Sequence, residues 1–135
     1  MIRILTAMLV VLALAPSAAP AAGCSGPNPA ITSLAVKSVS NSGMTNTYHI
    51  SGTVTNLGTQ GQASSTLQFV DIYVDTQKRN DRGIPPLASG QSYTFGFDWT
   101  RSSDAGAGTT TVRFRLRMVQ GSDCNPANGS RSITF

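Results

Sequence analysis

The stretch TTTVRFRLRMV, residues 109–119, decides the fold because apolar and charged side chains alternate along it. One face of this stretch carries the apolar side chains of Val112, Phe114, Leu116 and Met118. The other face carries Arg113, Arg115 and Arg117. A period of two is typical of a β-strand with one buried and one exposed face. The sequence therefore predicts a strand that presents three arginines to solvent.

Six further segments have strand character, and turn residues separate them. Residues 46–56 alternate as strictly as 109–119, whereas 66–75 is apolar on both faces and is expected to be a central strand. No segment of the mature chain shows a helical period. The expected strands cover about 30–40, 46–56, 66–75, a short Lys- and Arg-rich edge strand between 76 and 85, 91–99, 109–119 and 130–135. The predicted fold is all-β, a seven-stranded antiparallel Ig-like β-sandwich.

Composition supports one exported globular domain. The chain has 135 residues, 40% of them hydrophobic and only 12% charged, so a charged disordered tail is not expected. All six acidic residues are Asp, and the lack of Glu favours strands and turns over helices. The expected organisation is a signal peptide at 1–21, a short lead at 22–29 and the sandwich domain at 30–135.

Residues 1–21 have the three parts of a signal peptide. Arg3 supplies the positive start, and the apolar run at 4–14 is too short to span a bilayer, which needs about 20 residues. Residues 19–21 read Ala-Pro-Ala, the form of a cleavage site, so we expect the mature chain to begin at Ala22. Its location is then periplasmic or extracellular, with no transmembrane segment in the mature chain.

Cys24 and Cys124 are the two cysteines of the chain, and an exported protein is expected to pair them in a disulfide. In the predicted topology, the start of the first strand and the loop after 109–119 lie at the same end, so the pairing needs no distortion. The alternatives are two free thiols, or lipidation of Cys24, since residues 21–24 read as a degenerate lipobox that would anchor the protein in a membrane.

Three segments together resemble the CARDB family, the "cell adhesion related domain found in bacteria". They are YHISGTVTNLG at 48–58, FVDIYVD at 69–75 and PLASGQSYTFGFDW at 86–99. The resemblance implies an Ig-like or fibronectin-like sandwich on exported bacterial proteins, with no enzymatic activity and no defined ligand. Residues 121–129 depart from the family pattern, because the acidic hairpin usual there is replaced by a cysteine-containing loop.

The inventory of reactive side chains predicts neither catalytic residues nor a metal or cofactor site. His49 is the only histidine, and nothing in the sequence marks an orienting carboxylate or an oxyanion hole for it. Asp71 and Asp75 are expected about 13 Å apart on one strand, which is too far to share one calcium ion. We therefore expect a surface histidine, two solvated carboxylates and no small-molecule substrate.

The arginines at 113, 115 and 117 are the candidate anion-binding residues. In one interpretation they hold a polyanion such as lipopolysaccharide, an acidic glycan or nucleic acid, with Arg101, Arg131 or Lys37 extending the patch. In the other they are an ordinary solvent-facing row that pairs with Asp98 on the neighbouring strand.

The function expected from these observations is binding, not catalysis. The primary hypothesis is an exported, non-catalytic binding or adhesion module that recognises a protein or a glycan at the cell envelope. The loops at the cysteine end or the arginine strand would make the contact. The alternative hypothesis is a binder of lipopolysaccharide, an acidic glycan or nucleic acid that acts through the strand face of Arg113, Arg115 and Arg117.

Overall fold

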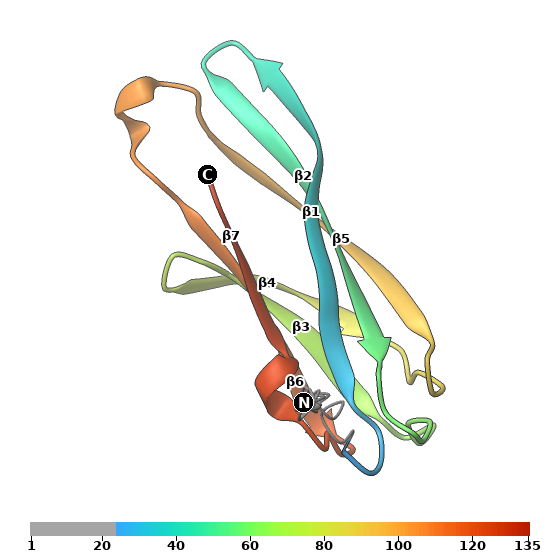
Figure 1. Ribbon diagram of the computed structural model, residues 1–135. Coiled ribbons are helices and arrows are strands. Elements are labelled where there is room, and N and C mark those ends of the chain that lie inside the picture. Colours follow the sequence, from blue (N-terminus) through green and yellow to red (C-terminus); the bar gives the residue numbers. More distant parts are fainter. Residues whose placement is uncertain (1–23) are drawn as a thin grey trace, which may run out of the picture.

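The computed structural model describes residues 24–135, so the expected signal peptide at 1–21 lies outside the described residues. The described chain forms two antiparallel sheets that pack face to face (Figure 1), with strand orders β1-β2-β5 and β4-β3-β6-β7. Two short 3₁₀ turns, η1 and η2, flank β6. The elements are β1 (Pro29–Ser42), β2 (Thr45–Asn56), β3 (Leu67–Val74), β4 (Gln77–Ile84), β5 (Ser92–Ser102), η1 (Ala105–Ala107), β6 (Thr111–Gln120), η2 (Pro126–Asn128) and β7 (Ser130–Thr134). The predicted seven-stranded antiparallel sandwich is confirmed.

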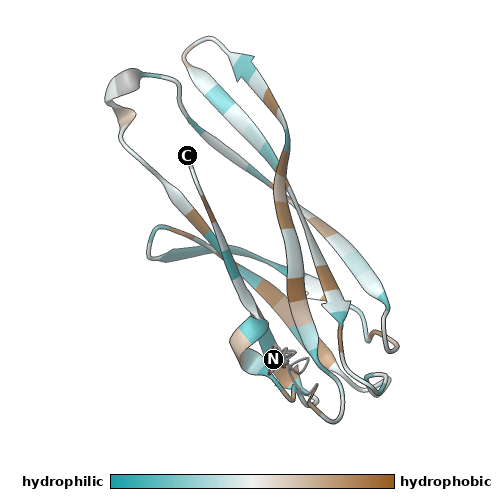
Figure 2. Ribbon diagram, viewed as in Figure 1, coloured by the Kyte–Doolittle hydropathy of each residue, from teal (hydrophilic) through white to brown (hydrophobic). Residues whose placement is uncertain are grey.

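The core lies between the two sheets and follows from the alternation along β2, β5 and β6. Hydrophobic residues recur along the strands of both sheets (Figure 2), and those in the core include Val70, Ile72 and Val74 of β3 and Val112 and Phe114 of β6. Val70, Ile72, Val112 and Phe114 have no exposed surface. β3 lies between β4 and β6, which confirms its expected central position.

The aromatic side chains of β5 are buried to different extents. Phe95 and Phe97 are buried and their rings pack against the Phe114 ring of β6, with centroids 5.7 and 6.2 Å away. Trp99 is half-buried, and Tyr93 is 40% exposed. Tyr93 is the more exposed because β5 is an edge strand of its sheet and Tyr93 lies near its start.

The end of β2 is held by one buried amide side chain. Asn56 has no exposed surface, and its Oδ1 accepts hydrogen bonds from the backbone N–H of Asn28 at 2.9 Å and of Gly58 at 3.0 Å. Its Nδ2 donates to the carbonyl oxygens of Gln60 at 2.8 Å and Leu87 at 3.1 Å. All four bonds of the amide are therefore satisfied within the fold, and three loops meet at this residue.

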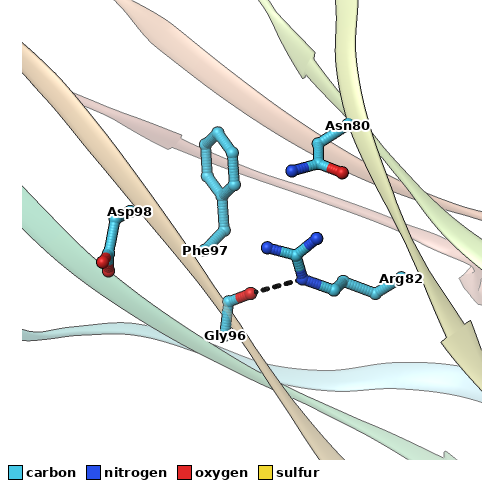
Figure 3. Close-up of a pocket in the computed structure, with 5 residues that line it drawn as sticks. All are labelled: Asn80, Arg82, Gly96, Phe97 and Asp98. Carbon is cyan, nitrogen blue, oxygen red and sulfur yellow. Dashed lines mark hydrogen bonds between the residues drawn. The ribbon is translucent and has the colours of Figure 1, made fainter.

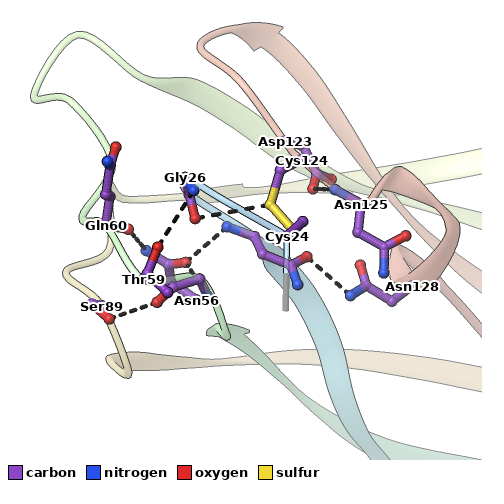
Figure 4. The surroundings of a disulfide bond; sticks show 12 residues. Cys24, Gly26, Asn56, Thr59, Gln60, Ser89, Asp123, Cys124, Asn125 and Asn128 are labelled. Atoms are coloured by element: carbon purple, nitrogen blue, oxygen red, sulfur yellow. Dashed lines mark hydrogen bonds between the residues drawn. A yellow bond between two sulfur atoms is a disulfide. The ribbon is translucent and has the colours of Figure 1, made fainter. Parts of the chain in front are cut away.

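The Cys24–Cys124 disulfide joins the N-terminal lead to the loop between β6 and β7 (Figure 4). The two Cα atoms lie 5.7 Å apart, and the Cys124 N–H donates to the Pro27 carbonyl at 3.0 Å. This is the pairing that the topology predicted. A Cys24 sulfur in this bond is not available for a lipid thioether, and the described residues contain no free thiol.

Candidate functional site: the arginine face

The outer face of the four-stranded sheet carries the three candidate arginines. In the register of β6 with β3, Arg117 lies opposite Phe69, Arg115 opposite Asp71 and Arg113 opposite Tyr73. Opposite residues of an antiparallel pair share a face of the sheet. β3 therefore places an aromatic ring, a carboxylate and a second ring beside the arginine row. We call this surface, formed by Phe69, Asp71, Tyr73, Arg113, Arg115 and Arg117, the arginine face.

Asp71 is the buried anchor of the arginine face, and the prediction that it is solvated was wrong. Its side chain is 3% exposed. Arg117 donates to it through two nitrogens, Nε to Oδ2 at 2.7 Å and Nη2 to Oδ1 at 3.1 Å. The Lys78 ammonium of β4 lies 2.9 Å from Oδ1. Neighbouring strands on both sides of β3 thus cover this carboxylate, which explains its burial.

The charge of Asp71 is stabilised by these two cations. Burial alone would raise the pKa of the carboxyl group, but the hydrogen bonds from Arg117 and Lys78 outweigh burial and hold its pKa below the usual value. Asp71 therefore stays ionised and keeps the Arg117 side chain in one place.

Two of the arginines are also held against aromatic rings. The Arg113 guanidinium lies 4.8 Å from the centroid of the Tyr73 ring, and that of Arg117 lies 5.0 Å from the Phe69 ring. Both distances are within the range of cation–π contacts. These contacts restrain the long side chains, so less conformational entropy is lost when a ligand binds them.

Arg115 differs from its two neighbours. Its side chain is exposed, and among the described residues it takes part in none of the ion pairs, side-chain hydrogen bonds or ring contacts of this face. It lines a hollow of about 270 Å³ together with Asp71, Tyr73 and Arg117. Although Arg115 lies directly opposite Asp71 in the register, the carboxylate bonds diagonally to Arg117. The result is a guanidinium whose donors are open to a ligand.

The prediction that the arginine row pairs with Asp98 was wrong. β5 and β6 are consecutive in the chain but lie in different sheets, so Asp98 is not a neighbour of the row. Asp98 bonds to His49 instead. The acidic partner of the row is Asp71, and it could have been found from the sequence. Residues 66–75 and 109–119 correspond to strands that are neighbours in a sandwich of this type. Phe69, Asp71 and Tyr73 share one face of the first of these strands.

The three cations proposed to extend the patch do not join it. The Arg131 Nε donates to the Ile31 carbonyl at 2.7 Å and so ties β7 to β1. Arg101, on β5, donates to the carbonyl oxygens of Phe135 and Gly108. Lys37 lies on β1, in the other sheet. The candidate site is therefore limited to the arginine face itself.

A second polar cluster lies on the outer face of the three-stranded sheet. The His49 Nδ1 is 2.8 Å from Asp98 Oδ1, and its Nε2 is 3.3 Å from the Ser40 hydroxyl. An orienting carboxylate is thus present, which the sequence did not indicate. Acyl transfer also needs preorganised donors for an oxyanion. His49 lies on β2, which pairs with β1 on one side and β5 on the other. The backbone N–H groups of β2 therefore bond to these two strands and do not serve as oxyanion donors beside His49.

Comparison with known proteins identifies the family. The CARDB family model matches residues 31–117, which include most of β1, all of β2 to β5 and most of β6. The chain belongs to the CARDB family. CARDB domains are adhesion-related bacterial β-sandwich modules and are not a known catalytic family. No curated protein matches the chain, and no solved structure matches it.

The disulfide and the CARDB domain fit an exported protein. Within residues 24–135, no helix is long and apolar enough to cross a bilayer. The same residues bring together no group of three or more His, Cys, Asp or Glu side chains suited to a metal ion.

Proposed function

We propose that this CARDB protein is an exported, non-catalytic binding module that holds an anionic glycan of the cell envelope on its arginine face. The ligand class covers lipopolysaccharide and acidic or sulfated polysaccharides. The protein would be released from its signal peptide at Ala22 and would act in the periplasm or outside the cell. The proposal rests on the adhesion-related family of the chain and on the cationic side chains of the arginine face.

The Arg115 guanidinium, which has no ion pair or side-chain hydrogen bond within residues 24–135, is the observation that supports this proposal. Arg113 and Arg117 lie two residues away on either side, and each is restrained by partners of its own. Neighbouring side chains on one face of a strand are about 6.6–6.8 Å apart. The row thus offers a series of planar donors that suits the repeated carboxylate, sulfate or phosphate groups of a polymer.

The charge of the surrounding surface favours the same ligand class. Lys78 adds a fourth cation beside the row, whereas the two acids nearby, Asp71 and Asp81, both contact Lys78. These four cations and two acids leave the surface positive. The whole chain is also positive, with a formal net charge of +4 at pH 7. Such a surface attracts an anionic polymer, and salt weakens the attraction.

The proposal is tested by charge reversal of the two arginines that do not hold Asp71. Arg113→Glu/Arg115→Glu is compared with wild type on immobilised heparin and on lipopolysaccharide. We expect the double variant to elute at clearly lower salt on both. Lys37→Glu is the control, because it removes the same type of charge from the other sheet.

Arg117 is left unchanged because its loss would also leave Asp71 short of a partner. Unchanged retention of the double variant on both matrices would contradict the proposal. If the double variant is retained less on single-stranded DNA than wild type but binds both glycans equally well, the ligand of the arginine face is nucleic acid and not a glycan.

A further inference from the structure

β5 is the one edge strand of the described sandwich that is both long and regular, and its outer edge is unpaired. All eleven residues of β5 pair with β2 without a shift in register. By contrast, β1 is interrupted by two bulges, β4 carries the charged run Lys78–Arg82, and β7 has five residues. Bulges, charges and short length are the usual protections of a sheet edge against a further strand. β5 lacks all three along most of its length.

The backbone groups of this edge can be assigned from one hydrogen bond. The Arg82 Nε donates to the Gly96 carbonyl oxygen at 3.0 Å (Figure 3). That oxygen therefore points away from β2. In an antiparallel ladder, the N–H and C=O of one residue point to the same side, and the sides alternate along the strand. Thr94, Gly96 and Asp98 thus present their amide and carbonyl groups along the free edge.

Arg82 lies across the centre of this edge. It comes from β4, the edge strand of the other sheet, and also donates to the Asp81 carbonyl at 3.1 Å. With Asn80, Phe97 and Asp98 it lines a hollow of about 230 Å³ between the two edges (Figure 3). A strand added to β5 has to take the place that the Arg82 side chain occupies on Gly96.

We propose that the β5 edge is a self-association surface for a second copy of this chain, and that Arg82 gates it. The two β5 strands would pair in antiparallel orientation about a two-fold axis at Gly96, and would join two three-stranded sheets into one of six strands. This register places Thr94 of one copy opposite Asp98 of the other, so no like charges face each other. An isologous contact of this kind closes as a dimer. The inference does not depend on the proposed glycan ligand.

The self-complementarity of the edge selects a second copy as the occupant. Asp98 is the one charged residue among those that point outward at 92, 94, 96, 98, 100 and 102, and the axis at Gly96 separates it from its counterpart. Gly96 has no side chain to hinder the crossing point.

The gate is tested by sedimentation equilibrium of wild type, Arg82→Ala and Arg79→Ala with the disulfide intact. We expect Arg82→Ala to lower the dimer dissociation constant at least tenfold, and Arg79→Ala, an exposed arginine of the same strand, to match wild type. Thr94→Pro in the Arg82→Ala background removes an outward amide without touching the β2 ladder, and is expected to restore the wild-type equilibrium.

Hydrogen exchange keeps the test decisive if Arg82→Ala is less stable. In the proposed dimer, the amides of Gly96 and Asp98 become protected as protein concentration rises, whereas outward amides of β4 do not. Arg82→Ala that stays as monomeric as wild type would overturn the proposal. So would a dimer that persists with Thr94→Pro, or one that protects a different edge.

Discussion

Replacement of Asn56 by alanine tests how the CARDB motif that ends β2 stabilises the fold. The amide makes four hydrogen bonds in a site with no exposed surface. Two of its partners keep alternatives in the variant, since the Leu87 carbonyl still accepts from the Gln62 N–H at 2.9 Å and Gln60 is exposed to water. The N–H groups of Asn28 and Gly58, both on buried residues, have no other acceptor among the described residues.

The expected loss follows from these two orphaned donors. A buried donor left without an acceptor costs about 1–3 kcal/mol, so Asn56→Ala is expected to lower the free energy of unfolding by about 2–6 kcal/mol. The assay is equilibrium urea unfolding of the oxidised protein, followed by the fluorescence of Trp99, with the slope checked for two-state behaviour.

Asn41→Ala is the matched control for this experiment. Asn41 also bonds through its side chain, to the Thr45 carbonyl and to Asn46, but these bonds are exposed to solvent. Its removal is expected to change the free energy of unfolding by less than about 0.5 kcal/mol. If Asn56→Ala loses no more than Asn41→Ala, the reasoning that buried donors decide the stability of this end is refuted.

Three further predictions concern the same fold. Gly58→Ala is expected to cost about 1–3 kcal/mol by overpacking, because an added Cβ would meet the Gly26 carbonyl oxygen; urea unfolding equal to wild type would show that this loop gives way freely. The lowered pKa of Asp71 predicts a stabilisation that is present above about pH 4 and lost as pH falls through the folded pKa, so the stability difference between wild type and Asp71→Asn is larger at about pH 6 than at about pH 2; a difference independent of pH would contradict it. Joint replacement of Cys24 and Cys124 by serine is expected to lower the free energy of unfolding by about 2–5 kcal/mol, since the disulfide closes a loop of about 100 residues. A change below about 0.5 kcal/mol in denaturant unfolding would show that the disulfide contributes little to stability.

The alternation along single strands was enough to predict which residues face the core. Along β6 it separated Phe114 from Arg113 and Arg115 before any neighbour was known, because the period of two is a local property. The disulfide between Cys24 and Cys124 followed from topology, since both cysteines lie at one end of the sandwich.

The alternation along single strands did not predict which charged residues pair with each other. Asp98 is nearer in sequence to the arginine row than Asp71 is, yet the chain changes sheets between β5 and β6, so Asp98 meets His49 instead. The diagonal choice of Arg117 over Arg115 by Asp71 depends on side-chain geometry that alternation does not contain. The proposed function depends on Arg115 having no charged partner in the described part of the chain, and this was therefore found only in the structure.

The salt dependence of glycan binding tests the central claim most directly. Binding of a size-defined sulfated oligosaccharide to wild type, Arg115→Gln and Lys37→Gln is titrated by calorimetry over a series of salt concentrations. Each cation that contacts an anionic group contributes close to one unit to the slope of log affinity against log salt. We expect Arg115→Gln to bind more weakly and to lower this slope by about one unit, while Lys37→Gln matches wild type. Equal slopes for wild type and Arg115→Gln, or affinity that does not change with salt, would contradict the assignment of the arginine face as the binding surface.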